Sequence, residues 1–316
     1  MTNTPYRIGF WMDPIEEIRP YKDTSFALML AAQALGWDIY YLPKTGLSID
    51  QGEPMGVMAK ARVQDTKTDF VSLEALTRQP LDQLDCIMIR TDPPFDGEYL
   101  YATQILDRAC SRGVRVINRP GALRDFNEKL FATEFPDLMP TTLVSASHAE
   151  LRAFQKDVGE IILKPLDGMG GAGIFRIGRD GMNLGTVLET LGGLEQRLIM
   201  AQGYRPEIAE GDKRVLILHG VPHSHALARI PMQGETRGNL AAGGRGVAQP
   251  LTEREREIAT TVAPRLVAQG LVFVGLDVIG GYLTEINLTS PTCVREIDAQ
   301  TGSDIAYEFL KKLVDE

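Results

Sequence analysis

Three oxygen-bearing side chains, Asp277, Glu285 and Asn287, interrupt a segment that otherwise has the pattern of an apolar β-hairpin closed by Gly280-Gly281. Burying carboxylates in an apolar sheet is costly unless a cation or another partner compensates the charge. Hard oxygen donors of this kind suit Mg²⁺. A hairpin at the edge of a sheet, with its acids exposed to solvent, explains the same residues equally well.

The length of the turn decides whether the three side chains can share a face of the sheet. Glu285 and Asn287 are two residues apart and therefore lie on one face of their strand. A three-residue turn over residues 280–282 would place Asp277 opposite Glu285, whereas a two-residue turn would place the two acids on opposite faces. The sequence leaves both arrangements open.

A second candidate for chemistry is the glycine-rich segment Asp167–Gly173, which follows a predicted strand ending at Lys164-Pro165. Glycines let the backbone approach a ligand closely and direct N–H groups at an anion. Lys164 adds a positive charge for phosphate oxygens. The segment is neither a Walker loop nor a dinucleotide fingerprint, because it connects two predicted strands. A phosphate flap and a plain glycine-rich hairpin turn are both consistent with it.

Positive charges form the third group. Residues 234–246 contain five glycines together with Arg237 and Arg245, a composition that suits a lid over an anionic ligand, with a disordered surface linker as the alternative. Arg214 and Arg229 stand among aliphatic residues of predicted strands, where each needs an anionic partner. That partner is either an acid of the hairpin or a ligand phosphate. Spacing alone predicts that Lys129 is a solvated surface lysine.

The order of predicted strands and helices, which position these residues, changes along the chain. Up to residue 117, strand and helix patterns alternate, which predicts an open, mostly parallel sheet with flanking helices. Beyond it, strands are more frequent, and two helices begin at the capping-box patterns Ser147-x-x-Glu150 and Thr252-x-x-Glu255. The longest loop is predicted over residues 231–250. Strands are predicted at 6–12, 39–42, 86–90, 114–117, 161–164, 173–177, 198–202, 214–219 and 224–230, and helices at 24–35, 98–112, 147–158, 252–270 and 305–313.

Composition narrows the classes of function. The chain has 316 residues, of which 44% are hydrophobic and 24% charged, as in ordinary globular proteins. A net charge of −9 disfavours a generic grip on nucleic acid. No stretch approaches the roughly 20 apolar residues of a membrane span, and the start of the chain lacks a signal-peptide pattern. The three cysteines have no paired spacing, which indicates free thiols in a reducing compartment. From charge, hydropathy and cysteine pattern together, we expect a cytoplasmic protein without nucleic-acid or membrane partners.

Taken together and in order, several segments closely resemble the bacterial glutathione synthetase family of the ATP-grasp superfamily. The segments are 127–129, 162–171, 212–215, 227–231, 234–246 and 284–292, and residues 12–14 and 90–96 fit the same family. Each motif is individually weak, whereas the ordered set covers the chain from about Tyr6 to Glu296.

The resemblance implies an α/β and α+β fold. An N-terminal open parallel-sheet substrate domain over residues 1–125 would precede a two-lobed ATP-grasp domain over residues 126–316. Its smaller lobe would cover about 126–202 and its C-terminal lobe about 203–316, with a lid at 231–246. The implied activity condenses γ-glutamylcysteine with glycine through an acyl phosphate, giving glutathione, ADP and phosphate. Another ATP-grasp carboxylate–amine ligase and a non-catalytic ATP-binding regulator are the alternatives.

The resemblance also implies ATP and Mg²⁺ as cofactors, with Mn²⁺ as an alternative metal, and a homotetramer. It assigns metal binding to Asp277, Glu285 and Asn287. It turns Lys129 into a nucleotide lysine, against the prediction from spacing. The implied catalytic arginines are Arg214, Arg229, Arg237 and Arg245. The implied nucleotide-binding residues are Lys129, Lys164, Asp167, Gly168, Met169, Gly170, Gly171, Met200, Ala201, Gln202, Gly203, Tyr204 and Asp212, with residues 200–204 as a hinge whose backbone reads adenine and Asp212 on the ribose.

Overall fold

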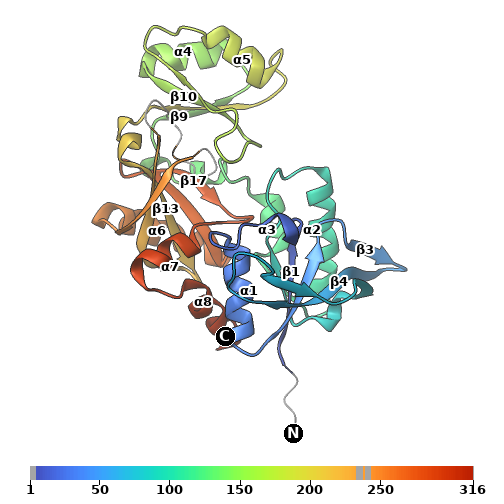
Figure 1. Cartoon of the computed structure of the whole chain (residues 1–316). Helices are drawn as coiled ribbons and strands as arrows, with labels where there is room; N and C mark the ends of the chain where they lie inside the picture. Colours follow the sequence, from blue (N-terminus) through green and yellow to red (C-terminus); the bar gives the residue numbers. More distant parts are fainter. Residues whose placement is uncertain (1–4, 233–237, 239–242, 316) are drawn as a thin grey trace.

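Within residues 5–232, 238 and 243–315, which the computed structural model describes, the chain folds into three sheets that each carry helices (Figure 1). The first sheet belongs to an N-terminal domain, the second to a small lobe, and the third to a large lobe formed by most of the remaining chain. An open α/β domain followed by two α+β lobes confirms the fold class that the sequence predicts.

A parallel sheet forms the centre of the N-terminal domain, in which β2, β1, β7 and β8 lie side by side in that order. Helix α2 covers the face that carries Ile87 and Ile89, and α1 covers the face of Phe10 and Met88, so the strands are apolar on both sides. The strands are β1 (Arg7–Met12), β2 (Asp38–Pro43), β7 (Cys86–Ile89) and β8 (Arg115–Ile117). The helices are α1 (Thr24–Ala34), α2 (Gly97–Cys110) and α3 (Pro120–Asp125).

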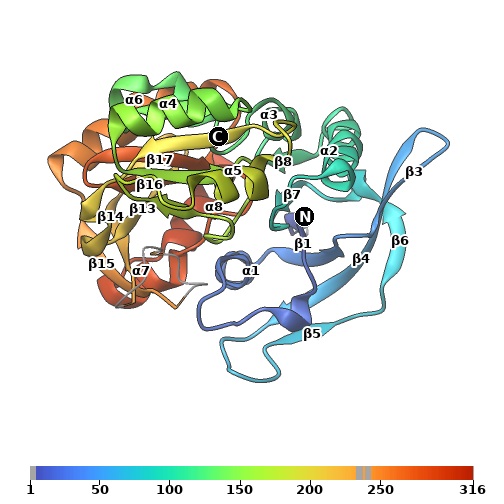
Figure 2. The ribbon, with the colours of Figure 1, turned by 90° about the horizontal axis from the view of Figure 1, so that it is seen from above.

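An antiparallel extension continues this sheet beyond β2. The long strand β4 (Glu53–Val63) pairs with β2 and with three short strands, and Figure 2 shows β3 and β4 projecting from the body of the domain. The short strands are β3 (Leu47–Asp50), β5 (Val71–Leu73) and β6 (Thr77–Pro80). Short 3₁₀ helices occur at η1 (Ile15–Glu17), η2 (Leu81–Gln83), η3 (Phe131–Glu134), η4 (Pro136–Leu138) and η5 (Pro206–Glu210).

The small lobe is an antiparallel sheet, in the order β11-β10-β12-β9, covered by two helices. Ser147 caps α4 by accepting a hydrogen bond from the Glu150 N–H at 3.3 Å. The Glu150 carboxylate accepts from the Ser145 hydroxyl at 2.5 Å, so only half of the predicted capping box forms. The elements are β9 (Thr142–Ser145), α4 (His148–Val158), β10 (Ile161–Pro165), β11 (Phe175–Ile177), α5 (Leu184–Gly192) and β12 (Ile199–Gly203).

The large lobe contains an antiparallel sheet in the order β15-β14-β13-β16-β17. Helix α6 begins at the complete capping box that the sequence predicts, in which Thr252 and Glu255 exchange hydrogen bonds. The elements are β13 (Asp212–Leu218), β14 (Val221–Ile230), β15 (Arg245–Pro250), α6 (Glu253–Ala268), β16 (Phe273–Ile279), β17 (Tyr282–Asn287), α7 (Val294–Thr301) and α8 (Ile305–Asp315).

The predicted long loop over residues 231–250 is wrong at its C-terminal end. Residues 245–250 form β15, which pairs antiparallel with β14. The polar, glycine-containing sequence gives little local strand signal, so this strand depends on the neighbour that supplies its hydrogen bonds. Gly246 lies so close to Leu227 that a Cβ atom there would come within 3.1 Å of the leucine Cδ2 atom.

The hydrophobic cores join two of the three units and leave the third separate. One core combines Trp11 and Leu42 of the N-terminal domain with Val215 and Leu276 of the large lobe. A second combines residues of α1 with residues of β16, α7 and α8. The small lobe has a core of its own. The N-terminal domain and the large lobe therefore pack as one body, which carries the small lobe (Figures 1 and 2).

A buried asparagine fastens these two units together beside the hairpin. The Asn118 amide oxygen accepts from the N–H groups of Val272 and Phe273 at 2.9 and 3.0 Å. Its amide nitrogen donates to the carbonyls of Phe273 and Leu288 at 2.8 and 2.7 Å. The start of β16 and the chain just after β17 are thus held by one side chain of the N-terminal domain. No helix in the described part of the chain is long and apolar enough to cross a membrane.

Candidate active site

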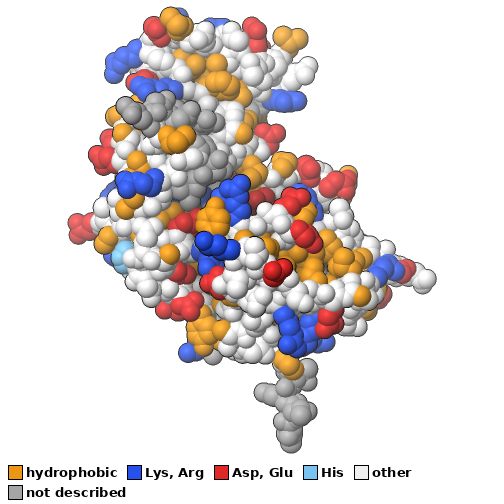
Figure 3. All heavy atoms as spheres, in the orientation of Figure 1, with side chains coloured by type: hydrophobic (Ala, Val, Ile, Leu, Met, Phe, Trp, Pro, Cys, Tyr) orange, Lys and Arg blue, Asp and Glu red, His pale blue; other side chains and the backbone are white. Residues whose placement is uncertain are grey.

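A cleft of about 720 Å³ lies where the three units meet, a size that suits a nucleotide or a similar small molecule. The N-terminal domain contributes Asp13, Lys22 and Asp92, the small lobe contributes Lys164 and residues 168–172, and the large lobe contributes the charged residues of its sheet. Figure 3 shows acidic and basic side chains close together at the junction of the units. Such mixed charge suits a ligand that bears both negative and positive groups.

In the β16–β17 hairpin Asp277 lies opposite Glu285, and the length of the turn alone does not explain this pairing. The turn has two residues, since Ile279 pairs with Tyr282. A bulge then shifts the register, so that Asp277 pairs with Glu285 rather than with Thr284. The prediction that a two-residue turn separates the two acids is therefore wrong, because it assumed a regular ladder.

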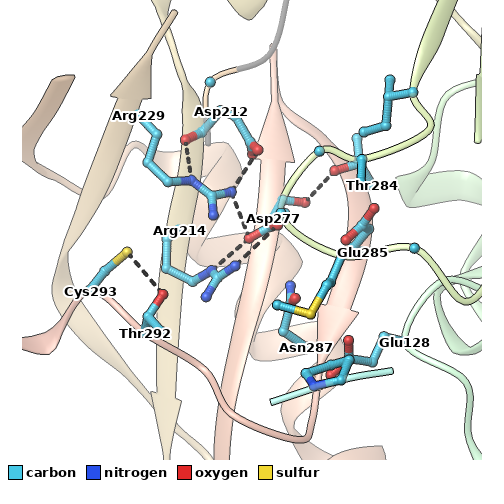
Figure 4. A pocket seen from close by; sticks show the side chains of 18 of the residues that line it. Glu128, Asp212, Arg214, Arg229, Asp277, Thr284, Glu285, Asn287, Thr292 and Cys293 are labelled. Atoms are coloured by element: carbon cyan, nitrogen blue, oxygen red, sulfur yellow. Dashed lines mark hydrogen bonds and ion pairs between the residues drawn. The ribbon is translucent and has the colours of Figure 1, made fainter. Parts of the chain in front are cut away.

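Two arginines from neighbouring strands neutralise the acids of the large lobe (Figure 4). The Arg214 Nε and Nη2 atoms donate to the two Asp277 carboxylate oxygens at 2.7 and 3.3 Å. The Arg229 Nη2 atom lies 2.9 Å from Asp277 Oδ1 and 2.6 Å from Asp212 Oδ2. All four side chains are buried. The anionic partners that these strand arginines require are therefore the acids of the sheet.

This network separates the acidities of its two carboxyl groups. Burial raises the pKa of Asp212 to about 6, although Arg229 opposes the rise. Burial also acts to raise the pKa of Asp277, but the guanidinium groups of Arg214 and Arg229 together hold it well below its usual range. Asp277 is therefore ionised at neutral pH.

Two buried lysines lie close to Glu285, the other acid of the hairpin. Lys129 and Lys164 are each only 4% exposed. The Lys164 Nζ atom lies 3.4 Å from Glu285 Oε1, and the Lys129 Nζ atom lies 3.8 Å from the same oxygen. The surface position that spacing predicts for Lys129 is wrong, because Lys129 is buried in a turn whose N–H groups donate to the Asn127 side chain, and not on an exposed helix.

The glycine-rich segment lies between β10 and β11 and lines the cleft from the small lobe. Gly170, Gly171 and Gly173 have positive φ angles of 60°, 84° and 71°, which residues with a side chain rarely adopt. The Lys129 ammonium group donates to the Gly168 carbonyl at 2.6 Å. The segment is therefore tied at its root to a cation while its glycine backbone faces the cavity.

The hairpin carries oxygen donors of the kind that a hard divalent cation takes. No group of three or more His, Cys, Asp or Glu suited to a metal occurs among the described residues, so the third donor would be the amide oxygen of Asn287. The Asn287 amide nitrogen donates to the Gly275 carbonyl at 3.2 Å, which leaves its oxygen as the remaining polar atom. Two carboxylates and one amide oxygen match the ligands that Mg²⁺ prefers.

The structure brings most of the predicted site residues to this cleft. The predicted residues that line it are Lys129, Lys164, Gly168, Met169, Gly170, Gly171, Gln202, Gly203, Tyr204, Asp212, Arg214, Arg229, Asp277, Glu285 and Asn287. Asp167 and Arg245 are exposed and lie outside the lining, whereas Met200 and Ala201 are buried in the small lobe. Arg237 lies outside the described residues.

The hinge differs from what the resemblance implies, and several cleft residues were not predicted. The N–H groups of Gly203 and Tyr204 donate to the carbonyls of Thr141 and Glu160, both at 2.9 Å, and are therefore engaged within the protein. Sequence reasoning also missed Glu128, although it belongs to the segment that identified Lys129. Further cleft residues that were missed are Asp13, Glu17, Arg19, Lys22, Asp23, Asp92, Thr292 and Glu296.

Comparison with known proteins gives matches over most of the chain. The family model "Prokaryotic glutathione synthetase, N-terminal domain" matches residues 6–124, and "Prokaryotic glutathione synthetase, ATP-grasp domain" matches residues 128–302. A glutathione synthetase of Yersinia pestis is 54% identical over 293 residues, which are 93% of this chain and 92% of that protein. One of Pseudomonas aeruginosa is 54% identical over 304 residues, 96% of each chain.

Solved structures with low sequence identity share the fold. The D-cycloserine synthetase DcsG superposes with a TM-score of 0.70 at 16% identity, covering 98% of this chain and 99% of that one. The D-alanyl-alanine synthetase A of Vibrio cholerae superposes with a TM-score of 0.58 at 13% identity, covering 99% and 98%. The match therefore includes the N-terminal domain as well as the two lobes.

Proposed function

The chain belongs to the prokaryotic glutathione synthetase family and is an ATP-dependent ligase, and from this premise we propose how its cleft joins γ-glutamylcysteine to glycine. The observation that carries the proposal is the convergence, in one cleft, of two buried lysines, a glycine-rich segment and an acidic hairpin backed by two arginines. This combination suits the transfer of a phosphoryl group onto a carboxylate.

The cleft divides into a phosphate side and a substrate side. Lys129 and Lys164 bind phosphate oxygens of ATP, and the backbone of residues 168–171 covers them. Asp167 flanks this cover, Asp212 accepts from the ribose, and the hinge Met200-Ala201-Gln202-Gly203-Tyr204 borders the base. A Mg²⁺ ion held by Asp277, Glu285 and Asn287 would neutralise phosphate charge, and Mn²⁺ suits the same oxygen donors.

The chemistry needs no nucleophile from the protein. A cysteinyl carboxylate oxygen of the dipeptide attacks the γ-phosphorus and ADP leaves. The glycine amine then attacks the acyl carbon, the C–O bond to the phosphate breaks, and the amine proton passes to solvent. Arg214 and Arg229 offset the negative charge of the acyl phosphate and of the tetrahedral intermediate. The lid segment, which excludes water from the acyl phosphate, carries Arg237, and Arg245 stands at its C-terminal end, where β15 begins.

The setting of the reaction is also part of the proposal. We place it in the cytoplasm, which is supported by Cys86, Cys110 and Cys293 being free thiols. A homotetramer is proposed from the family resemblance alone.

The proposal is tested by measuring ADP, phosphate and glutathione together, with γ-glutamylcysteine present and glycine added or omitted. Equal amounts of the three products, dependent on glycine and on Mg²⁺, are expected. Lys164→Met, which removes a phosphate contact but keeps the apolar stem, should abolish all three. ADP formed only with other acceptors would indicate a different carboxylate–amine ligase, and no ADP with any acceptor would indicate a binding protein.

A further inference from the structure

Glu128 lies beside Asn287 in the cleft and has no role in the reaction described above (Figure 4). One oxygen of its carboxylate, Oε1, accepts three hydrogen bonds. They come from the Leu288 N–H at 2.7 Å, the Thr289 N–H at 3.0 Å and the Thr289 hydroxyl at 2.9 Å. The Glu128 backbone carbonyl accepts from the Ile286 N–H at 2.9 Å. One residue therefore holds the chain on both sides of Asn287.

These hydrogen bonds lie at the end of β17, an edge strand. Among the described residues of the large-lobe sheet, β17 pairs with β16 alone. Glu128 occupies the other side at the end of the strand, where the chain leaves the sheet. The end of β17 is consequently fixed by a residue from outside the lobe.

The neighbours of Glu128 link the same point to the nucleotide side. Lys129, the next residue, donates to the Gly168 carbonyl and lies 3.8 Å from Glu285 Oε1. The Asn127 amide nitrogen donates to the Leu166 carbonyl at 3.0 Å. Three consecutive residues thus connect the flap of the small lobe with the oxygen donors of the large lobe.

We propose that Glu128 is a positioning residue, which sets Asn287 and Glu285 at the correct distance from Lys129 by hydrogen bonding to the end of β17. The inference deepens the proposed function and rests on it. The role depends on acceptor geometry rather than on negative charge, since the three bonds converge on one oxygen. A glutamine at this position offers an amide oxygen with the same reach and should preserve the arrangement.

The test measures metal binding without turnover. Mn²⁺ is titrated into the full-length protein with a non-hydrolysable ATP analogue, and free Mn²⁺ is followed by electron paramagnetic resonance. Groups that orient metal ligands typically contribute about 10- to 100-fold in metal affinity, so Glu128→Ala should weaken Mn²⁺ binding by about that factor. Glu128→Gln should recover most of the loss. Thr289→Val, which removes one of the three donors, should show a smaller loss in the same direction.

Asp298→Ala is the matched control. Asp298 Oδ1 accepts from the Ser303 hydroxyl at 2.7 Å and from the Ile305 N–H at 3.2 Å, and Asp298 lies outside the cleft lining. The Asp298→Ala substitution removes a similar carboxylate-to-backbone bond from the region between α7 and α8, and it should leave Mn²⁺ affinity unchanged.

Three results would overturn the inference. They are wild-type affinity in Glu128→Ala, a Glu128→Gln variant as weak as the alanine variant, and an equal loss in Asp298→Ala. If Glu128→Ala does not fold, Glu128→Gln and Thr289→Val decide the question, because wild-type affinity in Thr289→Val overturns the inference. If the wild-type protein binds no Mn²⁺ with the nucleotide analogue, the proposed metal site itself fails and the inference falls with it.

Discussion

Asp277 has two demands placed on it, since it is both a proposed metal ligand and the anion between two arginines. Its oxygens lie within 3.3 Å of the guanidinium groups of Arg214 and Arg229. If Asp277 loses its charge, both arginines lose an anionic partner, although Arg229 keeps Asp212. Breaking a buried pair of this kind costs about 3–5 kcal/mol. The acids of the hairpin therefore serve the fold as well as the chemistry.

Asp277→Asn tests the contribution of this charge to stability. Because the folded-state pKa of Asp277 is depressed, its stabilisation is present above its unfolded pKa of about 4 and is lost as the pH falls further. The variant should be about 3–5 kcal/mol less stable than the wild type at pH 7, and this difference should shrink below about pH 4. Urea unfolding at a series of pH values measures it, and a difference independent of pH would contradict the assigned ionisation.

Arg229→Lys tests the charge-offsetting role while a cation remains beside Asp212 and Asp277. A lysine cannot reproduce the fork geometry of a guanidinium group. Turnover should fall by about 10²- to 10³-fold, as when a preorganised donor is removed from a transition state. Nucleotide affinity, measured by calorimetry, should change much less. A variant with wild-type turnover would remove Arg229 from the mechanism.

At this scale the sequence predicts residue types better than partners. Arg214 and Arg229 are recognisable as buried arginines that need an anion, but the choice between sheet acids and ligand phosphates requires the three-dimensional pairing. The burial of Lys129 is not visible from spacing, because it depends on contacts with Gly168 and Glu285, which are distant in sequence. The resemblance to a family supplied that assignment.

At the scale of elements, the hairpin depends on close contact between Gly275 and an arginine of the next strand. A Cβ atom on Gly275 would lie 2.7 Å from the Cδ atom and 3.1 Å from the Nε atom of Arg214. Arg214 is held by its two bonds to Asp277 and has little room to move. The glycine therefore permits the arginine to lie flat across β16.

Gly275→Ala should displace Arg214 and lower turnover by about 10²-fold, the typical effect of a misplacement of about 1 Å in an active site. Overpacking should also cost about 1–3 kcal/mol of stability. Gly9→Ala is the matched control, because a Cβ atom there would lie 2.7 Å from Leu84 in the N-terminal core. The control should lose stability but keep its turnover per folded molecule. Equal turnover in the two variants would contradict the argument.

The two elements that sequence patterns describe poorly are both set by tertiary pairing. The bulge at Thr284 adds one residue to β17, and nothing in the local pattern of alternation signals it. Strand β15 lies in a polar, glycine-rich segment and forms along β14. In contrast, the start of the helix after Thr252 is marked in the sequence by its capping box, although the helix continues through Pro264.

At the scale of the whole molecule, the separate core of the small lobe predicts where motion occurs. The cores of the N-terminal domain and large lobe run across their boundary, and Asn118 adds four hydrogen bonds there. Residues 142–203 of the small lobe have no share in those two cores as they are described, whereas Phe131 and Leu138, which precede this range, belong to the first core. Independent cooperative units open with their own free energies.

Native-state hydrogen exchange should therefore show amides of residues 142–203 exchanging through an opening of lower free energy than those of β1, β13 and β16. Adding ATP analogue and Mg²⁺ should raise protection most in the small lobe, because the ligand bridges it to the large lobe. Equal protection across all three units, with or without nucleotide, would contradict this division.

The overall architecture is largely predictable from sequence, because alternating strand and helix patterns specify the N-terminal sheet. How the units meet is not, since the cleft depends on contacts between residues more than 100 positions apart, such as Lys164 and Glu285. Asp13 and Asp92 lie in segments that the resemblance includes, but their position in the cleft became visible only in the folded chain.

The central claim is that this cleft activates the dipeptide carboxylate by direct transfer of a phosphoryl group. γ-Glutamylcysteine labelled with ¹⁸O in its cysteinyl carboxylate, turned over with ATP and glycine, tests it by mass spectrometry of the released phosphate. One labelled oxygen per phosphate is expected, because the C–O bond breaks when the amine attacks the acyl carbon. Phosphate without label, alongside normal glutathione formation, would contradict the account.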